Sequence, residues 1–84
     1  MTDPAQPQAW DTEIDATGLL CPLPVLKARK RLLAMAPGQV LRLVATDPAS
    51  IVDVPHFCSQ SGDSLFATED SGAAHVFLIR KGST

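Results

Sequence analysis

Two prolines, Pro22 and Pro24, stand directly before an apolar pattern with helical spacing, and they constrain the fold of this chain more than any other feature. Proline suits the first position of a helix, because the N–H group that it lacks would have no partner there. The residue before a proline avoids the helical region, so we expect Leu23 to be the N-cap and Pro24 to begin a helix. A Pro-Gly pair should stop this helix at about Ala36.

The other elements follow from hydrophobic periodicity and turn residues. Alternating or branched apolar residues predict four strands, at residues 13–16, 39–46, 64–68 and 74–81. A second helix is predicted from the Asp47-Pro48 pair to about Ser61, with a kink or a split first turn at Pro55. The order is therefore βαβαββ, with the first two strands parallel and the last two antiparallel. We predict an α/β fold, a two-layer sandwich in which two helices cover one face of a mixed four-stranded sheet.

Length and charge limit the class of protein. The 84 residues suit a single domain, at residues 11–84, after a flexible N-terminal tail at residues 1–10. The net charge of −2 argues against broad capture of nucleic acid, so direct nucleic acid binding is not expected. The sequence has neither an apolar run of about 20 residues nor a signal peptide pattern, so no membrane association is expected and we predict a cytoplasmic protein.

Cys21 lies in the loop that enters the first predicted helix. The positive end of that helix and the unpaired N–H groups of Val25 and Leu26 favour a thiolate, so we expect a lowered pKa. Pro22 and Pro24 stiffen the loop and give the sulfur a fixed direction. The alternative is a small buried side chain, because free cysteine is among the most buried residue types.

The second thiol, Cys58, falls in the middle of the second predicted helix. Core packing is the favoured interpretation, and a resolving thiol for Cys21 is the alternative. The two cysteines lack C-x-x-C spacing, and with His56 and His75 they form no paired ligand pattern, so no metal site is predicted.

The charged residues of the first helix allow two interpretations. Lys27, Lys30 and Arg31 form either a solvated face or a docking surface for an acidic partner. They lie opposite a predicted apolar arc, which comprises Val25, Leu26, Ala28, Leu32, Leu33 and Ala36. Arg29 falls inside this arc, where either its stem packs and its head reaches solvent, or its charge serves a partner or an anionic sulfur.

Two positions near the strand ends complete the candidate site. Asp47 is predicted to cap the second helix. It should also lie near Cys21, because both residues follow strands that are expected to pair in parallel. Gly18 is interpreted as a break in the backbone pattern ahead of the cysteine loop.

These residues together resemble the TusA/SirA family of small sulfur-carrier proteins. The resemblance runs from about residue 12 to residue 82, and its most specific part is the Cys-Pro-x-Pro motif. The matching positions are Asp15-Ala16-x-Gly18-Leu19-x-Cys21-Pro22-x-Pro24, Pro37-Gly38, Thr46-Asp47-Pro48, Asp53-x-Pro55-x-Phe57-Cys58 and Ile79-Arg80-Lys81-Gly82.

The resemblance implies a function as well as a βαβαββ sandwich. It implies a sulfurtransferase in which Cys21 carries sulfane sulfur as a persulfide, with Gly18, Pro22 and Pro24 as support and no resident cofactor. The implied donor is a cysteine desulfurase or a rhodanese-like protein, and an acceptor protein serves tRNA thiolation, molybdenum-cofactor supply or sulfur oxidation. The alternative is a regulatory binding module whose thiol senses oxidants, since an exposed cysteine of low pKa suits that role too.

Overall fold

The computed structural model describes residues 10–83, and the predicted tail lies outside them except for Trp10. The indole ring of Trp10 faces the guanidinium group of Arg42, whose Cζ atom lies 4.9 Å from the ring centroid. None of the helices in this part of the chain has the length and apolar character needed to cross a membrane. Six elements follow in the predicted order: β1 (Thr12–Ala16), α1 (Leu23–Leu33), β2 (Val40–Ala45), α2 (Ser50–Ser61), β3 (Ser64–Ser71) and β4 (Ala74–Arg80).

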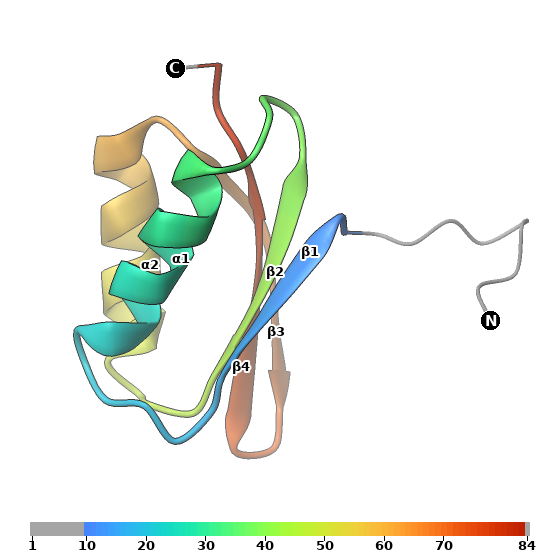
Figure 1. The fold of residues 1–84 in the computed structure, drawn as a ribbon. Helices are drawn as coiled ribbons and strands as arrows, with labels where there is room; N and C mark the ends of the chain where they lie inside the picture. Colours follow the sequence, from blue (N-terminus) through green and yellow to red (C-terminus); the bar gives the residue numbers. More distant parts are fainter. Residues whose placement is uncertain (1–9, 84) are drawn as a thin grey trace, which may run out of the picture.

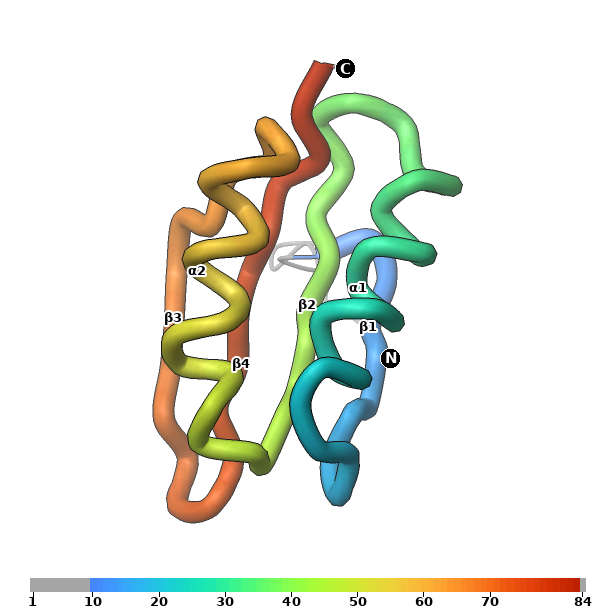
Figure 2. The backbone as a smooth tube through the Cα atoms, turned by 90° about the vertical axis from the view of Figure 1, so that its left-hand side faces the viewer, coloured from blue at the N-terminus to red at the C-terminus, as the bar shows by residue number. Residues whose placement is uncertain are grey.

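The strands form one mixed sheet in the spatial order β1-β2-β4-β3 (Figure 1). β1 and β2 are parallel, whereas β4 runs antiparallel to both β2 and β3. Both helices lie on the same face of the sheet, with α1 over β1 and β2 and with α2 over β3 and β4 (Figure 2). The predicted two-layer α/β sandwich is therefore confirmed.

The core lies between the two layers, and it is built from apolar side chains of β1, β2, β4 and both helices. Leu41 and Leu43 of the central strand β2 are fully buried against the helices. The remaining buried members of this cluster are Ile14, Ala16, Ala28, Leu32, Ala45, Val54, Cys58, Phe77 and Ile79. Because β2 is a central strand and is parallel to β1, the loops that follow these two strands leave the sheet at the same edge.

The start of α1 differs from the prediction by one residue. Pro22, rather than Leu23, is the N-cap, and Pro24 occupies the second helical position. The Leu23 N–H donates to the carbonyl oxygen of Leu20 at 2.9 Å, so a turn precedes the helix and draws Leu23 into it. Both positions tolerate proline, because neither N–H group would have a partner inside the helix.

The apolar arc of α1 is narrower than the sequence pattern indicates. The buried residues are Pro24, Ala28 and Leu32, which form a single stripe at spacings of four residues. Leu26 is 50% exposed and Leu33 is 66% exposed, so these two residues of the predicted arc lie outside the core. α1 ends at Leu33, which leaves the predicted last turn in the following loop.

The start of α2 also differs. The helix begins at Ser50 and its N-cap is Ala49, so the predicted capping of α2 by Asp47 was wrong. Asp47 and Pro48 belong to the turn that leads into the helix. Pro55 lies inside a continuous helix, so the predicted split of the first turn was wrong. The hairpin strand β3 extends three residues beyond its predicted end, to Ser71. The two-residue turn that joins it to β4 contains Gly72, whose φ of +65° suits glycine.

Candidate functional site

Cys21 lies in the loop that follows β1. This loop and the loop after β2 lie at the same end of the sheet (Figure 1). The Gly18 N–H donates to Thr46 Oγ1 at 2.8 Å, and the Cys21 N–H donates to Asp47 Oδ2 at 2.6 Å. Each bond joins the loop after β1 to the loop after β2. The expected proximity of Asp47 and Cys21 is therefore confirmed, and it follows from the parallel pairing of the two strands.

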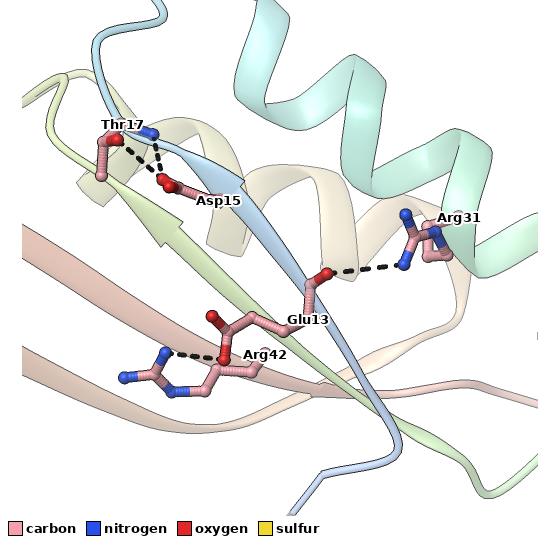
Figure 3. Close-up of polar contacts among 5 residues, drawn as sticks. All are labelled: Glu13, Asp15, Thr17, Arg31 and Arg42. Atoms are coloured by element: carbon pink, nitrogen blue, oxygen red, sulfur yellow. Dashed lines mark hydrogen bonds and ion pairs between the residues drawn. The ribbon is translucent and has the colours of Figure 1, made fainter.

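The chain leaves β1 through a turn that its own side chains stabilise. Asp15 Oδ1 accepts hydrogen bonds from the Thr17 N–H at 3.0 Å and from the Thr17 hydroxyl at 2.7 Å (Figure 3). These two bonds lower the pKa of Asp15. Gly18 follows with a φ of +80°, a conformation that glycine adopts without strain. The loop therefore has a defined path from β1 to the cysteine.

The Cys21 side chain is exposed at the mouth of a shallow hollow between α1 and α2. Its peptide bond to Pro22 is cis. The hollow has a volume of about 250 Å³, and it is lined by Cys21, Pro22, Val25, Asp53, His56, Phe57 and Gln60. Its walls come from the N-terminal turn of α1 on one side and from a single face of α2 on the other.

The electrostatic environment of Cys21 is the reverse of the prediction. Hydrogen bonding to the Asp53 carboxylate raises the pKa of the Cys21 thiol, and desolvation and the negative charges of Asp53 and Asp47 add to this effect. The N-terminus of α1 supplies little compensation, because Pro24 lacks an N–H and the Leu26 N–H already donates to the Pro22 carbonyl oxygen. The predicted thiolate was therefore wrong, and the thiol form is favoured.

Asp53 and its neighbours in the hollow were not among the predicted site residues. Their sequence spacing contained a usable signal, because Asp53, His56, Phe57 and Gln60 are three or four residues apart and so share one helical face. The polar residues on that helical face could have been predicted to form a surface beside the cysteine. What the spacing could not reveal is which side of α2 faces α1.

The basic residues of α1 lie around a different hollow. This hollow has a volume of about 330 Å³ and is lined by Ile14, Lys27, Lys30, Arg31 and Ala34. The Arg31 guanidinium donates to Thr12 Oγ1 at 2.5 Å, and it also donates to the Glu13 carbonyl oxygen at 3.5 Å (Figure 3). Both bonds tie α1 to β1. Arg31 thus has a structural contact, whereas Lys27 and Lys30 are exposed on the same side of the helix.

Arg29 is exposed and lies apart from the other cations of α1. It lines a third hollow of about 240 Å³, together with Leu32, Leu33, Phe57, Ser61, Asp63 and Lys81. Phe57 also lines the hollow beside Cys21, so the two depressions adjoin along the groove between the helices. Arg29 therefore faces the far end of that groove.

The second cysteine has a different environment. Cys58 is 4% exposed and belongs to the core, so the predicted core packing is confirmed. Burial, with a smaller contribution from the charge of Asp63, raises the pKa of the Cys58 thiol to about 11. His56 is exposed, and the Nδ1 atom of His75 lies 2.8 Å from Asp70 Oδ1. Within residues 10–83, no three His, Cys, Asp or Glu side chains are grouped as a metal ion requires.

The fold and the site define a class of protein, a small α/β sandwich that presents one cysteine thiol at its surface. A family model described as Sulfurtransferase TusA matches residues 12–81. The chain is 49% identical over 72 residues to the Sulfur carrier protein TusA of Allochromatium vinosum, which covers 86% of this chain and 95% of that protein.

A solved structure gives the same result for the fold. The crystal structure of the SirA-like protein from Desulfitobacterium hafniense superimposes with a TM-score of 0.76 at 25% identity, and the match covers 86% of this chain and 99% of that one. The chain belongs to the TusA family of sulfur-transfer proteins. The resemblance noted in the sequence motifs is thereby confirmed.

Proposed function

We propose that this protein carries sulfane sulfur as a persulfide on Cys21 and passes it from a donor protein to an acceptor protein. The exposure of Cys21 carries this proposal, because the chain has two cysteines and the other is buried in the core. The hydrogen bond between the Cys21 N–H and Asp47 holds the loop against β2, which keeps the sulfur at the surface. An accessible and fixed thiol is what exchange between two protein-bound sulfurs requires.

Each half of the transfer is a thiol–persulfide exchange. The Cys21 sulfur, after loss of its proton to solvent, attacks the outer sulfur of a donor persulfide, R–S–SH. The donor S–S bond breaks, R–S⁻ leaves and takes up a proton, and Cys21 becomes Cys–S–SH. In the second half a nucleophile of the acceptor attacks that outer sulfur, and the Cys21 thiolate is the leaving group. The chain therefore acts as a sulfurtransferase whose substrate is bound covalently.

The donor is a cysteine desulfurase or a rhodanese-like protein, since both present sulfur as a protein persulfide. Lys27 and Lys30 are the residues that we propose for docking, because they are exposed and flank the hollow between α1 and β1. Rim charges of this kind increase the association rate more than the affinity. Salt should therefore slow sulfur transfer between proteins more than it slows reaction of Cys21 with a small neutral reagent.

Redox sensing is less well supported. A sensor thiol is usually a thiolate and is often placed beside a resolving cysteine. Here the carboxylates of Asp53 and Asp47 raise the pKa of Cys21, and Cys58 is buried with a raised pKa of its own. Both observations favour a carrier over a sensor.

Loading of the protein tests the proposal. The protein is incubated with a cysteine desulfurase, cysteine and pyridoxal phosphate, and its intact mass is taken without reductant. We expect a gain of one sulfur, about 32 Da for conversion of Cys–SH to Cys–S–SH. Cys21→Ser should abolish this gain.

Cys58→Ala is the matched control for Cys21→Ser, because it removes the other thiol of the chain and should leave the gain in place. Loss of loading in Cys58→Ala alone would contradict the assignment of Cys21. A peroxide-induced disulfide between the two cysteines, with no sulfur loading, would favour the sensor.

A further inference from the structure

We propose that Asp53 keeps the Cys21 sulfur protonated in the free carrier, and that a cationic group beside the donor's reactive sulfur releases it. This inference rests on the proposed carrier function and names the partner chemistry at the same site. Cys21 belongs to the loop before α1 and Asp53 belongs to α2, yet both line the hollow between the two helices. Asp53 is thus a carboxylate in the same hollow as the reacting sulfur.

The charged groups around the Cys21 sulfur are mainly carboxylates. Asp47 approaches from the loop after β2, where its Oδ2 atom accepts the Cys21 N–H, and Asp53 approaches from α2. His56 is the remaining titratable side chain in the hollow, and α1 contributes only the uncharged Pro22 and Val25. The basic Lys27 and Lys30 line another hollow. Among residues 10–83, the lining of the Cys21 hollow therefore includes the Asp53 carboxylate and no Lys or Arg side chain, and Asp47 adds a second carboxylate at the Cys21 N–H.

Two carboxylates beside a thiol have two consequences. They disfavour the thiolate, and Asp53 contributes more than Asp47 to the raised pKa of Cys21. They also repel anionic reagents and attract cationic ones. The free carrier should therefore react slowly with small anionic thiols and disulfides, which protects the sulfur cargo from loss on the way to the acceptor.

A donor protein can reverse both effects. An Arg, Lys or protonated His side chain next to the donor persulfide would pair with Asp53, since the hollow is open to solvent and Asp53 is only half-buried. Once Asp53 is paired with a cation, a larger fraction of Cys21 is present as the thiolate at the same pH. The carrier is then activated only where a sulfur of the donor is present.

The test compares two symmetrical disulfides of opposite charge, cystamine and 3,3′-dithiodipropionate. In each reaction the Cys21 thiolate attacks one sulfur, the S–S bond breaks, and the other half leaves as a thiolate, so intact mass reports the rate. We expect the wild-type chain to react faster with cystamine at pH 7. Asp53→Asn should narrow the ratio of the two rates roughly 25-fold at low salt, because one unit charge at contact distance in water changes each rate about fivefold and the two reagents respond in opposite directions.

A pH profile separates this role from a structural one. The rate of alkylation by uncharged iodoacetamide should have its midpoint above the value for free cysteine, about 8.5, in the wild-type protein. Asp53→Asn should move the midpoint down and raise the rate at pH 7. Glu69→Gln is the matched control, because it removes the same charge from an exposed residue of β3. Should Asp53→Asn fail to fold, Asp53→Ser replaces it.

The inference is overturned if either Asp53 variant leaves both the disulfide preference and the pH midpoint unchanged, or if Glu69→Gln changes them equally. Neither measurement uses a sulfur donor. A carrier that shows the charge preference but gains no sulfur would therefore refute the proposed function alone. A carrier that loads normally without the preference would refute this inference alone.

Discussion

The two cysteines of this chain place the same residue type in two different environments. Cys21 is exposed in a loop at the carboxyl end of β1, whereas Cys58 is packed in the core from the middle of α2. Both thiols have a raised pKa, but the main cause is a hydrogen bond to Asp53 at Cys21 and burial at Cys58. A partner can neutralise a carboxylate at the surface, but it cannot expose a core residue without unfolding the domain. Only the first thiol can therefore be switched by binding.

The largest expected difference lies in the labelling rates of the two thiols. In native protein treated with iodoacetamide, Cys58 should react at least about a thousandfold more slowly than Cys21, because its exposure requires opening of the core. Peptide mass spectrometry over a time course measures both rates in one sample. A labelling rate of Cys58 within tenfold of the rate of Cys21 would mean that α2 opens locally. The two sites would then not differ in accessibility as proposed.

The raised pKa of Cys58 should make the stability of the folded protein depend on alkaline pH. The pKa of Cys58 is raised from 9.0 to about 11 in the folded protein, so above pH 9 the unfolded chain loses a proton that the folded chain keeps. The free energy of unfolding should therefore fall by about 2 kcal/mol between pH 8 and pH 11, as measured by urea denaturation. Cys58→Ala should remove most of this decline, and an equal decline in that variant would contradict burial as the cause.

The smallest expected effect is at the loop that positions Cys21. Asp47 accepts hydrogen bonds from the N–H groups of Cys21 and Ala49, so Asp47→Ala should reduce the free energy of unfolding by about 1–2 kcal/mol. Thermal denaturation measures this loss. Asp70→Ala, which removes an exposed carboxylate paired with His75, should cost less than about 1 kcal/mol. Equal losses in the two variants would show that the Asp47 contacts add nothing beyond an ordinary surface pair.

Local sequence patterns determined most of the fold. The order of strands and helices, the place of the prolines before α1, and the position of Cys21 in a loop could all be predicted, because each depends on residues close together in the chain. The burial of Cys58 could be predicted from its residue type and its helix. The exposure of Leu26 and Leu33 could not be predicted, because periodicity shows that a helix has an apolar side but not how wide a strip of it the neighbouring layer covers.

The environment of the reactive sulfur was decided by tertiary structure alone. The position of Cys21 before a helix predicted a thiolate, and this inference used only the residues of that helix. Asp53 belongs to the other helix, and it faces Cys21 only because the sheet holds α1 and α2 side by side. The pKa of a side chain depends on all charges within a few ångströms, whatever their distance along the chain. The sequence therefore determined which atom is presented, and the packing of the two helices decided its protonation.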